Sequence, residues 1–186
     1  MRYDTLRFNN QKDLSAMSVL HALVHYIDTF TDRSGRLLAW LALSMGLVTA
    51  LIVVLRYGFN IGSIMSQEAV VYMHGCLFML GTAYALKTGA HVRVDIFYRN
   101  FSPRAQAWVN SLGGIIFLLP LCIFIFFVSW DYVAESWAIR ETSPEPGGIP
   151  AVFLLKSLIP LMAINLFLQG LAETLRSALV LVEGRP

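Results

Sequence analysis

The chain has 186 residues, of which 56% are hydrophobic and 14% charged, and its formal net charge is +2. Soluble domains carry about 25% charged residues, so this composition excludes an ordinary soluble domain and indicates an integral membrane protein. The two cysteines, Cys76 and Cys122, lie in apolar stretches without metal-ligand spacing, which excludes a disulfide framework and indicates small buried hydrophobes.

The first 35 residues comprise a polar N-terminus and an amphipathic stretch. Apolar residues recur at three- and four-residue spacing from Leu14 to Phe30, which predicts an amphipathic helix for the membrane interface or for a partner. His21 and His25 are four residues apart, a spacing that a metal site can use. No carboxylate accompanies them, and we favour a solvated or headgroup-facing pair. No signal peptide is expected, because no small-residue cleavage site is present.

Four apolar stretches follow, over residues 37–57, 67–87, 103–130 and 151–173. Each is close to or longer than the about 20 residues that a helix needs to cross the hydrocarbon core. We therefore predict an all-α integral membrane domain over residues 36–182 with four transmembrane helices. An amphipathic interfacial helix precedes this domain, and a short tail, residues 183–186, follows it.

Turn-forming residues indicate where these helices end. Gly89 is a helix stop after the second stretch, and the serine–proline pair at residues 102–103 is a helix start before the third. Pro120 is expected to bend the third helix, and Pro160 is a second kink candidate. Residues 131–150 end in SPEPGGIP and are expected to form an irregular loop.

The distribution of Lys and Arg predicts the orientation in the membrane. With the N-terminus inside, the cytoplasmic segments hold eleven of the 14 basic residues, and the opposite side holds only Arg56, Arg140 and Lys156. Basic residues accumulate on the cytoplasmic side of membrane proteins. Both termini are therefore expected in the cytoplasm.

No catalytic arrangement is evident in the sequence, so we do not expect an enzyme. No nucleophile with a partnering base and no metal-binding motif is present. His74 is the one histidine predicted within a span, so two histidines cannot hold a haem inside one chain, and we favour a hydrogen-bonded core histidine. A complete transporter is also not favoured, since no internal repeat or intramembrane charge pair is found.

Several features instead favour close packing of helices and contact with a partner protein. Small residues that let helices approach closely are Gly75, Gly81, Ala83, Gly113 and Gly114. Asn165 and Gln169 lie four residues apart on the last span and can each bond to a neighbouring helix, for about 1 kcal/mol. A helical surface that faces another protein is the interpretation we favour.

The hairpin from Arg56 to Asp95 concentrates the unusual polar residues of the chain. Arg56 and Glu68 bracket its loop, either as an ion pair that holds two spans at one depth or as two separate solvated charges. A charged patch closes the hairpin: Lys87, His91, Arg93, Asp95 and Arg99. This patch is suited to anionic lipid, and a metal site at His91 and Asp95 is the less favoured alternative.

The amino-acid sequence of this hairpin resembles that of a known protein family. LRYGFN, then QEAVVY, then LGTAYALKTGAHVRVD are similar to the small membrane subunit (Q-type, small permease) of tripartite ATP-independent periplasmic (TRAP) transporters. ESWAIRETSPEPGGIPAVFLLKSLIP, followed by LQGLAETLR, is similar to one branch of that family. The resemblance covers residues 56–95 well and residues 135–176 moderately, and it rests on order, spacing and topology together.

The resemblance implies a scaffold role. Such a subunit pairs with a large elevator-type membrane subunit that binds sodium and an organic acid or related solute, and a periplasmic binding protein delivers the solute. The expected location is the bacterial inner membrane, in contact with its lipids. No cofactor is expected in this chain, because sodium belongs to the large subunit, and no nucleic acid is expected as a partner.

The resemblance also implies structural roles for nine residues: Arg56, Tyr57, Asn60, Glu68, Gly81, Tyr84, Gly89, His91 and Asp95. The family often has Trp-Ser-Glu-Glu where this chain has MSQE, so Glu68 is the sole carboxylate there. The loop carboxylates Glu135, Glu141 and Glu145 are candidates for contact with the binding protein, although a solvated acidic loop is favoured. The competing hypotheses are a haem or quinone anchor for a redox enzyme and an independent small channel or transporter.

Overall fold

The computed structural model describes the backbone of residues 2–90 and 98–183, with side chains from Met17 to Ala90 and from Tyr98 to Val182. Its elements are α1 (Arg2–Phe59), α2 (Ile64–Lys87), α4 (Pro103–Gly113), the π-helical turn η1 (Gly114–Leu118), α5 (Leu119–Ala138) and α6 (Val152–Glu183). Four helical stretches within these ranges are long and apolar enough to cross a membrane. The prediction of an all-α membrane protein with four spans is confirmed.

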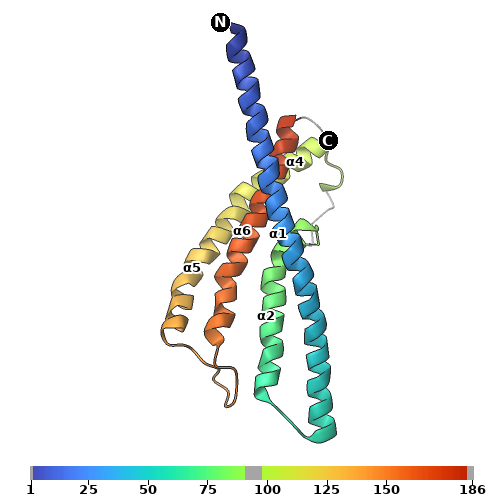
Figure 1. Cartoon of the computed structure of the whole chain (residues 1–186), viewed down its shortest axis with the longest axis vertical. Helices are drawn as coiled ribbons and strands as arrows, with labels where there is room; N and C mark the ends of the chain where they lie inside the picture. Colours follow the sequence, from blue (N-terminus) through green and yellow to red (C-terminus); the bar gives the residue numbers. More distant parts are fainter. Residues whose placement is uncertain (1, 91–97, 184–186) are drawn as a thin grey trace.

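The spanning helices form an open array. α1 packs on α2, α2 on α6, and α6 on α5, so α5 and α1 lie at opposite sides of the array (Figure 1). We call the end with the turns at residues 60–63 and 139–151 the hairpin end, and the other the terminal end. Such an array has little interior, and most of each span faces outward.

The N-terminal amphipathic stretch is helical as predicted, but it is the direct continuation of the first span within α1 and not a separate helix. Val24 and Ile27 form a small core with Ala172 of α6, so the apolar face of this stretch packs on protein. The charged residues between the two stretches do not stop a helix. A lone glycine lowers the stability of a helix by only about 1 kcal/mol relative to alanine. Gly35 is needed there, because a side chain at this position would overlap the Tyr84 ring.

The helix ends follow the turn-forming residues. Gly89 has a φ of 67°, and the Ala90 N–H donates to the Ala85 carbonyl at 2.9 Å, as in a Schellman cap. The prediction that Gly89 stops the second helix is confirmed. Asn60 after α1 and Arg140 after α5 adopt the same left-handed conformation, with φ of 55° and 50°.

The third span bends through a π-helical turn. Its start is the predicted serine cap: the Ser102 hydroxyl accepts a hydrogen bond from the Ala105 N–H at 3.3 Å. Pro120 cannot donate a backbone hydrogen bond, and the turn just before it widens to the π form. The helix then runs to Ala138, past the predicted end at residue 130, because exposed charged residues do not stop a helix outside the hydrocarbon core.

α6 is the central helix of the array. It packs on α1, α2, α4 and α5, and Pro160 lies inside it without interrupting it. Two close approaches depend on glycine: a side chain at Gly114 would overlap Thr174, and one at Gly170 would overlap Leu118. α6 therefore positions all the other spans.

Candidate functional site

A cluster of polar side chains joins α1 to α6 near the terminal end. Gln169 of α6 is fully buried, and its amide oxygen accepts a hydrogen bond from the Thr31 hydroxyl at 2.7 Å. Its amide nitrogen donates to Asp28 and to Glu173, each at 3.1 Å. Arg176 forms ion pairs with the same two carboxylates, each at 2.6 Å. These five residues are called the Gln169 cluster.

Lys87 extends the Gln169 cluster to α2. Its ammonium group donates to the Asp28 carbonyl at 2.9 Å and forms an ion pair with Asp32 at 2.6 Å. Three helices are thus tied at one depth. Buried polar groups are stable only when they are hydrogen-bonded, so the cluster fixes both the register and the depth of these helices.

Asn165 makes a second polar contact between helices, one turn along α6 from Gln169. Its amide nitrogen donates to the Leu80 carbonyl of α2 at 3.0 Å. Its amide oxygen is buried and has no hydrogen-bond partner within the described residues. Both amides predicted from their four-residue spacing therefore bond to neighbouring helices of this chain. The partners in α1, Asp28 and Thr31, carried no sequence signal beyond their place in an amphipathic helix.

Glu68 holds the long loop at the hairpin end. Its carboxylate accepts hydrogen bonds from the Ile149 N–H at 2.6 Å and from the Ser143 hydroxyl. Gly148 packs so closely on Ser143 and Glu68 that a side chain there would overlap both. Arg56 is exposed, and no ion pair joins it to Glu68. The two helices are therefore not joined by these charges, because the carboxylate faces the loop.

A second ionic contact anchors the same loop. Glu141 forms an ion pair with Lys156 at 2.5 Å and accepts a hydrogen bond from the Ser136 hydroxyl at 2.6 Å. Hydrogen bonds from Lys156 and Ser136 hold the pKa of the Glu141 carboxyl below its usual value. The Lys156 ammonium also lies 4.0 Å from the centre of the Tyr132 ring. The loop between α5 and α6 is thus held at both of its ends.

The other predicted residues are dispersed. Tyr57 and Asn60 are exposed at the hairpin end, and Tyr84 packs on Gly35. His91 and Asp95 lie outside the described residues. Glu135 and Glu145 are exposed, whereas Glu141 is engaged by Lys156.

The described histidines lie on the surface of the chain. His74 is exposed and stacks on Phe78 with ring centres 6.3 Å apart, so the prediction of a core histidine is wrong. It lies beside a groove between α1 and α2 that also includes Gly81. His21 and His25 are exposed on α1. Across the described ranges, no three His, Cys, Asp or Glu side chains are grouped as metal ligands.

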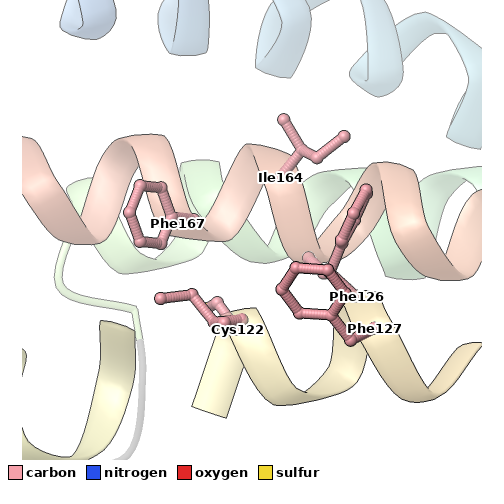
Figure 2. Close-up of a pocket in the computed structure, with 7 residues that line it drawn as sticks. Cys122, Phe126, Phe127, Ile164 and Phe167 are labelled. Carbon is pink, nitrogen blue, oxygen red and sulfur yellow. The ribbon is translucent and has the colours of Figure 1, made fainter. Parts of the chain in front are cut away.

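An apolar pocket lies between α5 and α6, with a volume of about 180 Å³. Figure 2 shows residues that line it: Cys122, Phe126 and Phe127 from α5, and Ile164 and Phe167 from α6. The walls are almost entirely hydrocarbon and contain no acid, base or cation. Such a pocket accommodates an acyl chain or an apolar side chain and cannot by itself carry out chemistry.

The sequence matches one known protein family. The chain belongs to the family described as "Tripartite ATP-independent periplasmic transporters, DctQ component", whose model matches residues 45–179. Members of this family are transporter subunits and not enzymes. The chain is therefore a small TRAP permease subunit with a multi-pass membrane fold.

Two relatives of this chain are named as TRAP transporter small permease proteins. A Vibrio cholerae protein, "C4-dicarboxylate TRAP transporter small permease protein DctQ", is 24% identical over 146 residues, which cover 72% of this chain and 62% of that protein. A TRAP transporter small permease protein of Haemophilus influenzae is 30% identical over 112 residues, which cover 60% of this chain and 67% of the relative. The chain thus spans less than two thirds of the Vibrio protein. No solved structure matches it.

Proposed function

We propose that this chain is the scaffold subunit of a TRAP transporter and that it pairs with a large elevator-type membrane subunit. The observation that supports this proposal is the open array of spans, fixed at one end by the Gln169 cluster and at the other by Glu68. A fixed wall with outward apolar faces can bind a second membrane protein through packing alone. Two pockets between α5 and α6 are lined mostly by apolar side chains.

The large subunit then carries the solute and sodium sites, and the sodium gradient drives uptake. A periplasmic binding protein delivers the solute. The printed name of the Vibrio cholerae relative includes C4-dicarboxylate, which supports an organic acid or a related solute as the cargo. The redox-anchor alternative is not favoured, because the family match is to a transporter component.

The proposed location is the bacterial inner membrane, with both termini in the cytoplasm. The excess of Lys and Arg toward the terminal end supports this orientation. The hairpin end then faces the periplasm, and its exposed carboxylates, Glu135 and Glu145, are candidates for contact with the binding protein.

Co-purification tests this function. The tagged chain is coexpressed with the large TRAP subunit of the same organism, extracted in mild detergent and purified through its own tag. We expect the large subunit in equal amount and no haem absorption. The complex in liposomes, with the binding protein and an inward sodium gradient, is expected to take up organic acid. Recovery of this chain alone, or uptake by this chain alone, would contradict the proposal.

A further inference from the structure

α1 has two neighbouring apolar stripes between Met17 and Arg36. One of them includes Val24 and Ile27 and packs on α6. The other points away from the protein: the exposed fractions are 66% for Val19, 42% for Leu23, 75% for Tyr26 and 52% for Phe30. We call this second set the outward stripe.

The outward stripe has the spacing of a helix–helix seam. Its members are separated by four, three and four residues. The same spacing then continues along α1 through Arg33, Leu37, Trp40, Ser44, Leu47, Leu51 and Val54, all of which are exposed. A repeat of 3.5 residues keeps one stripe facing a second helix that crosses at about 20°.

Lipid tails do not cover the whole seam. From Val19 to Val54 the helix rises about 52 Å at 1.5 Å per residue, whereas the hydrocarbon core is about 30 Å thick. The Gln169 cluster and the Lys87–Asp32 ion pair mark the charged boundary of the array at the terminal end. Most of the outward stripe lies on the N-terminal side of that boundary, where exposed apolar area is costly.

The charge of Arg33 determines which kind of helix can pack against this seam. It is an exposed member of the seam, and no carboxylate pairs with it within the described residues. The neighbouring Asp32 is engaged by Lys87. Copies of a membrane protein share one orientation, so two copies of α1 would pair in parallel and place Arg33 against Arg33. Like charges at the same layer of a seam are repulsive, which disfavours a second copy.

We propose that the outward stripe of α1 and its continuation through Arg33 form the docking surface for a long helix of a different membrane chain. That helix carries an apolar seam and an acidic residue opposite Arg33. The inference rests on the proposed function, since the occupant is then a helix of the large TRAP subunit that extends beyond the bilayer at the terminal end.

Photo-crosslinking in native membranes tests the docking surface. p-Benzoyl-phenylalanine replaces Tyr26 in the full chain, which is coexpressed with the large subunit. The matched control carries the same probe in place of His25, which is also exposed but lies about 100° around the helix. We expect an adduct with the large subunit from position 26 and at least about tenfold less from position 25.

A charge variant tests the role of Arg33. Arg33→Glu is expected to lower the crosslink yield from position 26 by about tenfold, and Arg33→Lys is expected to retain most of it. An acidic-to-basic change at the crosslinked site of the large subunit should restore the yield with Arg33→Glu.

Three outcomes would overturn the inference. They are an adduct of two copies of this chain, adducts with lipid only, and equal yields from positions 25 and 26. If the large subunit still co-purifies with the unmodified chain in any of these cases, the proposed function stands and only the docking surface is refuted.

Discussion

Gln169 connects residues that are far apart in the sequence. Thr31 and Asp28 lie well over 100 residues before it, yet all three meet in one hydrogen-bonded cluster. The Gln169 amide donates and accepts at the same time, which neither a carboxylate nor an apolar side chain of that size can do. Loss of this one side chain therefore leaves the buried Thr31 hydroxyl without its hydrogen-bond partner.

We expect Gln169→Leu to destabilise the protein by about 1–3 kcal/mol, since the buried Thr31 hydroxyl loses its hydrogen bond and the partly buried Asp28 carboxylate loses one of its bonds. For a chain of this size, about 2 kcal/mol corresponds to a fall in Tm of about 4–8 °C. Tryptophan fluorescence during heating in detergent measures the Tm. Gln67→Leu is the matched control, because Gln67 is exposed on α2. Equal effects of the two variants would contradict the role of the cluster.

Glu141 gives the loop a defined dependence on pH. Its pKa in the folded state lies below the usual value of 4.5, so its ion pair contributes stability above about pH 4.5. This contribution is lost as the pH falls through the lower, folded-state pKa. We expect Glu141→Gln to have a lower Tm than the unmodified chain at pH 7, with a difference that shrinks toward pH 3. A difference that stays constant over this range would count against the ion pair.

At the scale of the helix, the continuity of α1 is the feature that local sequence patterns did not predict. The apolar run begins at Leu37, and the charged residues before it suggested a boundary. The helix continues because Val24 and Ile27 are covered by α6, more than 130 residues away in the chain. Gly35 lies at the middle of this continuous helix and lets α2 approach.

A pair of glycine variants tests that close approach. Gly35→Ala is expected to cost about 1–3 kcal/mol, because the added methyl group overlaps the Tyr84 ring. Gly46→Ala is the control on the same helix. It meets no atom within 4 Å, and alanine favours a helix over glycine by roughly 0.5–1 kcal/mol. Opposite shifts in Tm are therefore expected, and a shift of the same sign in both variants would contradict tight packing at Gly35.

At the scale of the whole molecule, two helical hairpins are joined at both ends. One hairpin consists of α1 and α2, and the other of α5 and α6 (Figure 1). At the terminal end the two hairpins meet through the Gln169 cluster. At the hairpin end, Glu68 of α2 holds the loop that joins α5 to α6. The Glu68 carboxylate thus adds a polar connection between the two hairpins on that side.

Glu68→Ala is expected to free this loop and to speed tryptic cleavage after Arg140 by about tenfold, the change that corresponds to about 1.4 kcal/mol. The loop loses two hydrogen bonds to a charged acceptor. Mass spectrometry of timed digests in detergent measures the rate. Glu145→Ala removes an exposed carboxylate from the same loop and should leave the rate unchanged. Equal rates in all three proteins would refute the contact.

The sequence allowed the helical class, the four spans and the stop at Gly89 to be predicted, because apolar length and turn-forming residues are local properties. It also indicated that Asn165 and Gln169 face neighbouring helices. The bond from Glu68 to Ile149 and the exposure of His74 were not predicted. Each depends on where a distant segment packs, which a local pattern does not contain. The roles of His91 and Asp95 stay predictions.

The central position of α6 has a consequence for biosynthesis. The ribosome releases the N-terminal helices first, so Asp28, Thr31 and Lys87 are synthesised before Gln169 and Arg176. During that interval the earlier helices lack the surface on which they pack. The array can be completed only when the last helix is inserted.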